Sequence, residues 1–358
     1  MYTQRTCFIA LTAACLLGGP AAARAEQTGA AAAKPLKVFI LAGQSNMQGH
    51  AHVRTIDWLG QDKTHGKLVA KLKNSDGKPV EREDVWIYYN RDGKTPKKGN
   101  LTLGYGVSND HIGPEAMFGA VMGDHFDNQV LLIKTAWGGQ SLAVDFRPPS
   151  AGDVPLATYP EAMRDKMDAS IKAGKLSPGH KYREMIAEVQ KVLGDVKAQF
   201  PAYANQGVEL AGFVWFQGWN DMISKEFTAE YEKNMASFIN DVRKDLKAPK
   251  LPVVVAVMGV DGKEAGANVL TFRKAQTAGC NRPEFAGNVI ALPTDVYWDE
   301  EAAKFLKENW IQRKWPNEEA RLKWDTMGSQ PPYHYLGSAK VLSLIGFGCA
   351  ESMKTLLK

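Results

Sequence analysis

Residues 36–49 read Leu-Lys-Val-Phe-Ile-Leu-Ala-Gly-Gln-Ser-Asn-Met-Gln-Gly. The apolar run from Val38 to Ala42 has the length and the β-branched content of a buried strand. The run stops at Gly43, and a polar cluster centred on Ser45 follows at once. A serine presented at the carboxyl end of a strand can act as a nucleophile, because the following turn offers N–H groups to developing negative charge. The alternative is an ordinary strand-to-helix turn with Ser45 as the N-cap.

Strand-like and helix-like stretches alternate along the rest of the chain. Further strands are expected at 84–89, 130–135, 210–216, 252–258 and 289–292, and helices at 115–126, 182–200, 228–246, 269–277 and 335–357. This alternation predicts one α/β domain over residues 36–358, with a mainly parallel sheet covered on both faces. The proline-rich segment 140–180 has little periodicity, so we expect a functional insertion or a lid there.

The first 25 residues have the pattern of a cleavable signal peptide. Arg5 provides the positive start, residues 7–17 form the apolar core, and Ala23-Arg24-Ala25 precede the cleavage point. The apolar core is too short to span a bilayer as a stable helix, and no other stretch is long and apolar enough. We therefore expect a secreted or periplasmic protein without stable membrane insertion, whose mature N-terminus is loose over residues 26–35.

Charge and cysteine content exclude several classes of protein. The formal net charge is +5, and removal of Arg5 and Arg24 with the signal lowers it by two to +3. The basic residues are scattered, which argues against a nucleic-acid partner. Cys280 and Cys349 remain after cleavage, either as a disulfide or as two separate buried thiols. No Cys/His cluster has the spacing of a zinc site, so we expect no metal.

Three of the expected strands end in polar segments that carry groups useful for catalysis. The first strand is followed by Ser45, the strand at 130–135 by Gly138 and Gly139, and a later strand by Asn220. His334 stands just before the C-terminal helix. The carboxyl ends of parallel strands meet at one edge of a sheet, so we expect these groups to gather there. A hydroxyl, an imidazole and oxyanion donors are what acyl transfer requires.

Five dispersed motifs follow one another along the chain. They are Gly43-Gln-Ser-Asn-Met47, Gly113-Pro-Glu115 with Phe118-Gly119, Lys134-Thr-Ala-Trp-Gly-Gly-Gln-Ser141, Trp215-Phe-Gln-Gly-Trp-Asn-Asp221 and His334-Tyr-Leu-Gly-Ser338. With these motifs the chain resembles the sialate O-acetylesterase domain family, which belongs to the SGNH-type (GDSL-like) hydrolases. The resemblance runs from about residue 36 to the C-terminus. It implies a three-layer α/β/α sandwich of flavodoxin-like type and serine esterase chemistry that needs no cofactor.

The resemblance also implies a role for each matching residue. Ser45 matches the nucleophile, and His334 matches the general base that takes the serine proton. The side chain of Asn220 matches a donor of the oxyanion hole, together with the backbone N–H of Ser45 and that of Gly139. Gly138 is the alternative to Gly139.

One departure from the family pattern concerns the acid that orients the histidine. Related enzymes have an aspartate three residues before the histidine, where this chain has Pro331. Asp325 is the nearest upstream carboxylate, while Asp295 and Asp299 follow another strand and can also approach. A backbone carbonyl that holds the imidazole, giving a Ser-His dyad, is a further alternative.

Other residues near these motifs have two interpretations. Arg147 either meets a substrate carboxylate, such as that of sialic acid, or forms a structural ion pair. Trp137, Trp215 and Trp219 either stack on a sugar ring or pack in the core and at the rim. Asp221 is expected to cap a turn or helix rather than to act in catalysis.

The sequence as a whole predicts an exported serine esterase that removes O-acetyl groups from sugars or polysaccharides through an acetyl-enzyme on Ser45. Sialic acid, xylan and pectin all remain possible substrates. Two alternatives are a non-catalytic carbohydrate-binding protein on the same fold and a general acyl-ester hydrolase without sugar preference. The sequence leaves the oligomeric state open.

Overall fold

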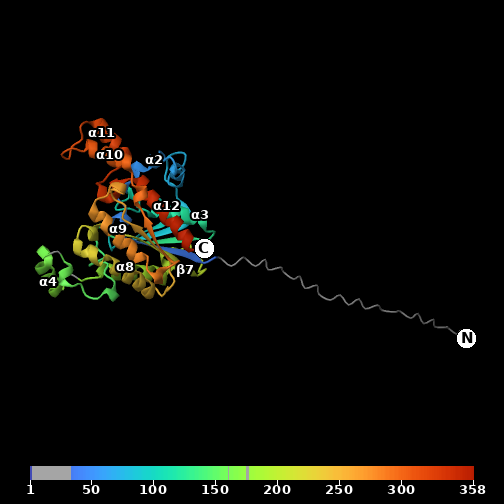
Figure 1. Ribbon diagram of the computed structural model, residues 1–358. Helices are drawn as coiled ribbons and strands as arrows, with labels where there is room; N and C mark the ends of the chain where they lie inside the picture. The colour runs from blue at the N-terminus through green and yellow to red at the C-terminus, as the bar shows by residue number, and fades with distance from the viewer. Residues whose placement is uncertain (2–33, 160, 175–176) are drawn as a thin grey trace. The chain divides into compact units, whose positions relative to one another are not determined.

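Strand β1 (Leu36–Gly43) lies inside the main sheet of the computed structural model (Figure 1). It pairs in parallel with β6 (Val130–Ala136) on one side and with β7 (Val208–Phe216) on the other. All residues of β1 except Lys37 are buried, as expected for a strand that is covered on both faces of the sheet. The buried strand predicted from the apolar run is therefore confirmed.

The structure describes residue 1 and residues 34–159, 161–174 and 177–358. The expected signal peptide and nearly all of the expected loose N-terminus lie outside the described residues. From Lys34 to Lys358 the chain forms one compact unit. No helix in the described part of the chain is both long and apolar enough to cross a membrane.

The main sheet has seven strands, and six of them are parallel. Besides β1, β6 and β7, it contains β3 (Arg82–Tyr89), β4 (Lys97–Leu101), β8 (Val253–Val257) and β9 (Val289–Pro293). Two further short strands are β2 (Ala51–His52) and β5 (His111–Ile112). The strand order is β4-β3-β6-β1-β7-β8-β9, and only the edge strand β4 runs antiparallel to its neighbour. β2 and β5 form a separate two-stranded ribbon. The expected mainly parallel sheet is confirmed.

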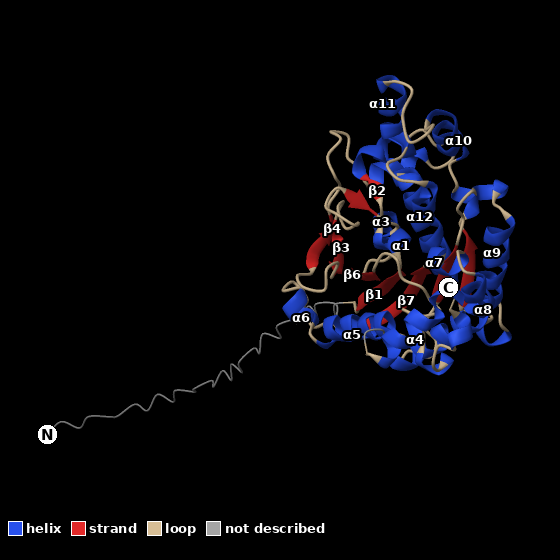
Figure 2. Cartoon of the chain, turned by 90° about the vertical axis from the view of Figure 1, so that its left-hand side faces the viewer, coloured by secondary structure: helices blue, strands red, loops and turns tan. Residues whose placement is uncertain are grey.

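Helices cover both faces of this sheet, which gives the three-layer α/β/α sandwich. They are α1 (Ser45–Gln48), α2 (Ile56–Leu59), α3 (Glu115–His125), α4 (Arg164–Lys172), α5 (His180–Gly194), α6 (Val196–Gln199), α7 (Trp219–Met222), α8 (Lys225–Asp245), α9 (Ala267–Cys280), α10 (Glu300–Asn309), α11 (Glu318–Met327) and α12 (Ala339–Leu356). In Figure 2, α3 and α12 lie on one side of the strands, and α5 and α8 on the other. The two faces are thus closed by different helix pairs.

Two of the expected helices depart from the structure, one by an internal break and one by a later start. The helix expected over 182–200 is divided at Asp195, whose side chain accepts a hydrogen bond from the N–H of Ala198 at 2.9 Å and so starts α6. The helix expected from Tyr335 begins only at Ala339, because the residues before it adopt left-handed backbone conformations. Apolar spacing cannot reveal either break, since the apolar pattern continues through both.

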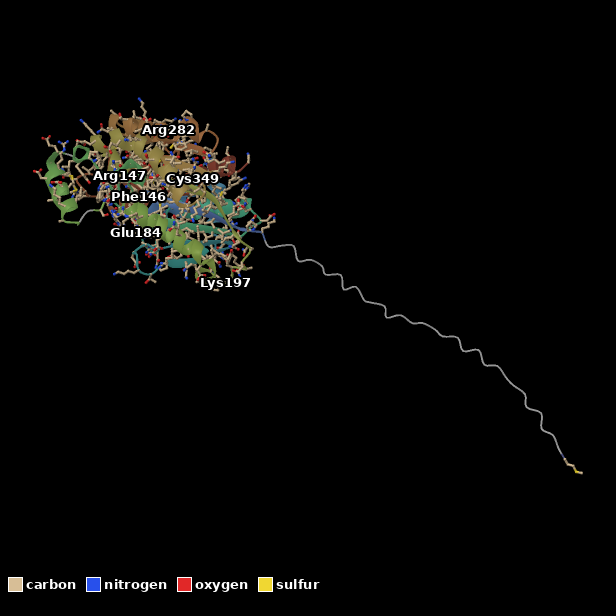
Figure 3. All side chains as sticks on the ribbon, turned by 90° about the horizontal axis from the view of Figure 1, so that it is seen from below. Phe146, Arg147, Glu184, Lys197, Arg282 and Cys349 are labelled. Carbon is tan, nitrogen blue, oxygen red and sulfur yellow. The ribbon has the colours of Figure 1, made fainter. Side chains whose placement is uncertain are left out.

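Arg147, labelled in Figure 3, is buried in the segment between β6 and α5. Its guanidinium donates to the carbonyl oxygens of Ala143 at 2.9 Å, Gly152 at 2.7 Å and Asp153 at 3.0 Å. It also pairs with Glu230 of α8 at 3.2 Å. These contacts favour the structural interpretation of Arg147, because its donors satisfy backbone groups within the insertion.

The two remaining cysteines lie in different helices. Cys280 ends α9 and Cys349 lies within α12, and both are free and buried. Burial raises the pKa of each thiol to about 12. Of the two alternatives, the separate buried thiols are the ones found.

Candidate active site

The end of β1 turns sharply because Gly43 touches the neighbouring strand. Its φ is +153°, and a Cβ atom at this position would lie 2.1 Å from the carbonyl oxygen of Phe216. Only glycine allows so close an approach of two strands. The chain then turns so that Ser45 starts α1 at the carboxyl edge of the sheet, with 7% of its surface exposed.

A cavity of about 300 Å³ opens at this edge of the sheet. Its lining comes from the segments that follow β1, β6 and β7 and from the segment before α12. The lining residues are Gln44, Ser45, Gln48, His50, Gly138, Gly139, Trp219, Asn220, Tyr333 and His334. The structure therefore brings Ser45, His334, Asn220 and both glycines to one cavity, as the sequence predicts.

His334 lies in a strained turn that hydrogen bonds of Tyr335 hold in place. Tyr335 and Leu336, the next two residues, have φ values of +51° and +62°. Non-glycine residues rarely adopt this conformation unless their surroundings enforce it. The buried hydroxyl of Tyr335 accepts a hydrogen bond from the N–H of Gly259 at 2.7 Å and lies 3.1 Å from the hydroxyl of Thr294. This anchor fixes the turn that places His334 at the cavity.

The imidazole of His334 stacks on a second imidazole, that of His50. The ring centroids are 3.9 Å apart and the planes are inclined by 17°. Burial lowers the pKa of His334 to about 4, and burial together with His334 lowers the pKa of His50 to about 3. Both rings are therefore neutral at pH 7, which is the state that a general base requires.

The expected orienting acid, Asp325, makes contacts away from His334. One carboxylate oxygen of Asp325 is 2.9 Å from Arg54 and the other is 2.7 Å from Arg321. Nδ1 of His334 is buried and has no hydrogen-bond partner in the described part of the chain. The structure thus pairs Asp325 with two arginines and shows no hydrogen bond between Asp325 and His334 among the described residues.

The other two carboxylates considered from the sequence are also engaged elsewhere. Asp299 accepts a hydrogen bond from the indole of Trp58 at 2.6 Å and caps α10. Asp295 lies 3.5 Å from Arg273. Neither forms a hydrogen bond with His334 among the described residues. The ring of His334 instead packs flat on His50 and edge-on against Tyr333, whose ring centroid is 4.5 Å away.

The side chain of Asn220 is oriented by a chain of amide hydrogen bonds. Gln44 Nε2 donates to Asn220 Oδ1 at 3.0 Å, and Asn220 Nδ2 donates to the carbonyl oxygen of Gly139 at 3.0 Å. Gln44 Oε1 in turn accepts from the N–H of Gly218 at 3.0 Å. Because Gln44 Oε1 faces a backbone donor, the amide direction of each side chain is fixed. One N–H of Asn220 remains for a ligand.

Gly138 and Gly139 occupy different positions relative to Ser45. A Cβ atom at Gly138 would lie 3.7 Å from Cβ of Ser45, whereas a Cβ atom at Gly139 would have no neighbour within 4 Å. Gly139 has φ of +74° and offers its carbonyl to Asn220. In the described part of the chain, neither glycine N–H donates to another backbone group. Both N–H groups are therefore available to a developing oxyanion.

The buried carboxylate of Asp221 binds backbone N–H groups of the loop that follows β6. Its carboxylate accepts hydrogen bonds from the N–H groups of Leu142 and Ala143, both at 2.9 Å, and from Gln217 Nε2 at 2.6 Å. Burial raises the pKa of Asp221 to about 7, while these three donors act in the opposite direction. The residue therefore ties the loop after β6 to the end of β7, which is a structural role, as expected from the sequence.

A buried ion pair near the end of α1 is a feature that the sequence does not predict. Lys134 in β6 and Glu115 in α3 are 2.7 Å apart, and both side chains are fully buried. Lys134 also donates to the carbonyl oxygens of Gln48 at 2.9 Å and Tyr105 at 2.7 Å. The end of α1 is thereby tied to the sheet. Both residues belong to quoted motifs, but nothing in their spacing indicates that they meet.

The groups gathered here define a class of protein. A hydroxyl, a neutral imidazole and oriented amide donors beyond the carboxyl ends of parallel strands form the equipment of an acyl-transfer enzyme. Among the described residues, no group of three His, Cys, Asp or Glu side chains has a geometry that could hold a metal ion.

Comparison with known proteins assigns the family. Residues 35–291 match the SASA family, carbohydrate esterases described as sialic acid-specific acetylesterases. The chain belongs to this family and is a carboxylic ester hydrolase. The match ends before His334, so the family assignment rests on the preceding motifs. No curated protein matches the sequence.

Several solved structures resemble the chain. NanS has a TM-score of 0.50 and 11% identity, covering 90% of this chain and 98% of that one. A protein from Arabidopsis thaliana has a TM-score of 0.43 and 15% identity, covering 82% and 95%. A carbohydrate acetylesterase from Xanthomonas citri has a TM-score of 0.40 and 13% identity, covering 68% and 47%. At these identities the similarity concerns the fold alone. The comparison with NanS confirms the expected α/β fold.

Proposed function

We propose that this protein is an exported serine esterase that removes O-acetyl groups from sugars or polysaccharides. The family description, which names carbohydrate esterases and acetylesterase activity, supports the reaction class. The observation that carries the proposal is the shared cavity, in which four separate segments present Ser45, His334, Asn220 and the glycine pair. Export rests on the signal-peptide pattern of residues 1–25.

The first half of the proposed reaction acylates Ser45. His334 takes the proton from the Ser45 hydroxyl while the oxygen attacks the acetyl carbonyl carbon. The negative charge that develops on the carbonyl oxygen accepts hydrogen bonds from Asn220 Nδ2 and from backbone N–H groups of Ser45 and the glycine pair. The tetrahedral intermediate collapses, and the proton passes from His334 to the departing sugar oxygen. Water activated by His334 then attacks the acetyl-enzyme and releases acetate.

His50 takes the place of the missing acid in this proposal. A carboxylate partner normally holds the ring of the histidine in position. Here the stacked ring of His50 restricts rotation of His334, and the buried anchor of Tyr335 restricts its backbone. The backbone-carbonyl alternative considered from sequence has no support, because Nδ1 of His334 has no partner among the described residues.

Acetate release from defined substrates tests the function. The purified protein is incubated with O-acetylated sialic acid, acetylated xylan and acetylated pectin, and acetate is measured enzymatically. A fluorophosphonate probe is applied in parallel, and we expect it to label the peptide that contains Ser45. Labelling without acetate release from any sugar would indicate a general acyl-ester hydrolase. Absence of both would favour the non-catalytic carbohydrate-binding alternative.

The low pKa of His334 predicts an unusual pH profile. Since the base must be neutral, kcat/KM for 4-nitrophenyl acetate should stay level from about pH 8 to about pH 5. It should then fall about tenfold per pH unit below the pKa of about 4. An acidic limb near the ordinary value of 6.5 would contradict the buried environment of the ring.

The lowered pKa of His334 also makes the stability of the fold depend on pH, so unfolding has to be followed in the same experiment. The unfolded chain binds the His334 proton near 6.5, while the folded chain binds it only near 4. Stability is therefore lost as the pH falls through this window. Tryptophan fluorescence recorded at each pH distinguishes unfolding from loss of the base.

A further inference from the structure

Three tryptophans form a row on the arm made by α10 and α11, which Figure 1 shows projecting beside α2. Trp310 and Trp315 have ring centroids 4.9 Å apart, and Trp315 and Trp324 have centroids 6.0 Å apart. Trp324 is buried, whereas Trp310 is 41% exposed. The buried end of the row holds the arm to the protein, and the exposed end is open to solvent.

The row lines a cleft of about 350 Å³, which we call the arm cleft. Arg54, Arg321 and Asp325 line it together with the three tryptophans, Leu306 and the segment 329–332. A neighbouring cleft of about 720 Å³ shares Leu306, Trp310 and Pro332 with it. Trp310 therefore lines both clefts.

The arm cleft and the catalytic cavity are built on one continuous segment. Pro331 and Pro332 line the arm cleft, and Tyr333 and His334 line the cavity. Consecutive Cα atoms are about 3.8 Å apart, so Pro332 and His334 are separated by less than about 8 Å along the chain. Tyr333 also lies 5.5 Å, between ring centroids, from Trp219 of the cavity. The arm cleft and the catalytic cavity are therefore neighbours, lined by consecutive residues of one segment.

The chemistry of the two clefts indicates the kind of ligand. Aromatic faces bind the apolar face of a sugar ring, and planar polar side chains bind its hydroxyl groups. Arg54, Asp325 and Arg321 already form a hydrogen-bonded row, in which Asp325 bridges the two arginines. Across both clefts, four basic side chains are balanced by four acidic ones. This balance suits an uncharged chain rather than a polyanion.

We propose that the arm cleft is a binding subsite for uncharged sugar units of an oligosaccharide or polysaccharide, whose acetylated unit lies at Ser45. The proposal rests on the proposed function and narrows its substrate to a glycan chain. Both helices of the arm follow residue 291, where the family match ends. Apart from Arg54, the residues that line the arm cleft therefore lie beyond the matched region.

The test compares substrates of increasing length. For acetylated xylo-oligosaccharides of one to six units, the KM of the wild type should fall about tenfold as the chain reaches Trp310. Trp310→Ala should abolish this dependence on length, while its kcat/KM for 4-nitrophenyl acetate and for the acetylated monosaccharide stays unchanged. Trp310→Phe should retain most of the effect. Leu322→Ala is the matched control, because Leu322 is 53% exposed on α11 and lines neither cleft.

A binding measurement separates failure of the subsite from failure of the proposed function. Calorimetry with deacetylated xylohexaose on Ser45→Ala, and on Ser45→Ala combined with Trp310→Ala, does not depend on turnover. Binding by the first variant and about tenfold weaker binding by the second support the subsite even if no sugar ester is hydrolysed. A KM that is independent of length, equal losses on all substrates, or tighter binding of an acidic oligosaccharide would overturn the proposal.

Discussion

Replacing Ser45 by alanine is expected to reduce kcat for acetyl-ester hydrolysis by about 10⁴-fold or more. The Ser45 hydroxyl is the side-chain group that bonds to the acetyl carbon in the proposed mechanism, so the oxyanion donors and His334 cannot compensate for its loss. Steady-state hydrolysis of 4-nitrophenyl acetate provides the measurement. Fluorophosphonate labelling of the same variant should disappear as well.

The fold should tolerate this change. Ser45 loses only a hydroxyl, and the α1 backbone remains tied by the hydrogen bond that Lys134 Nζ donates to Gln48 O. The midpoint of thermal unfolding should therefore stay close to that of the wild type. Ser170→Ala, a serine-to-alanine change on α4 outside the cavity, serves as the matched control. If Ser45→Ala retains activity within tenfold of the wild type, another nucleophile carries the reaction.

Replacing Lys134 by methionine is expected to lower the free energy of unfolding by about 3–5 kcal/mol. The change leaves the carboxylate of Glu115 buried without its cation, and it removes the donor from two backbone carbonyls. Guanidinium unfolding followed by tryptophan fluorescence measures the effect. Activity should fall too, because the end of α1 that follows Ser45 loses its tether.

Two comparisons decide whether the buried charge is the cause. Lys134→Met combined with Glu115→Gln should recover much of the loss, since no uncompensated charge remains in the interior. Lys172→Met removes an exposed lysine from an ion pair on α4 and should leave the unfolding free energy unchanged. A cost below about 1 kcal/mol for Lys134→Met would refute the proposed role of the pair.

Much of the fold could be predicted from local patterns. The strands at 130–135 and 289–292 agree with β6 and β9 to within a residue at each end. β6 is buried along its whole length, and β9 lies at a partly exposed edge of the sheet, yet both are largely apolar runs that stand out in a sequence. The edge strand β4 was not predicted, because its Lys-Lys-Gly-Asn-Leu sequence carries the charges typical of an exposed sheet edge. The α10–α11 arm was also missed.

The residues that line the candidate site could be predicted from the sequence, but the contacts that hold them in place could not. Ser45, His334, Asn220 and the glycine pair line one cavity, as expected from strand ends that meet at one edge. Asp325 was chosen as the nearest upstream carboxylate, yet nearness along the chain did not bring it into contact with His334. His50 had no signal in the sequence, because a stacked ring leaves no spacing pattern.

The sequence by itself determined the buried strands, the glycine that lets β1 approach β7, and the order of groups at the sheet edge. These features depend on hydrophobic periodicity and on residues with special backbone freedom, which are local properties. Only the tertiary structure decided how each group is held. Gln44 orients Asn220 across 176 residues of sequence, and His50 meets His334 through folding alone. Hydrogen bonds and ring contacts between distant segments form after the chain is packed, so no local pattern records them.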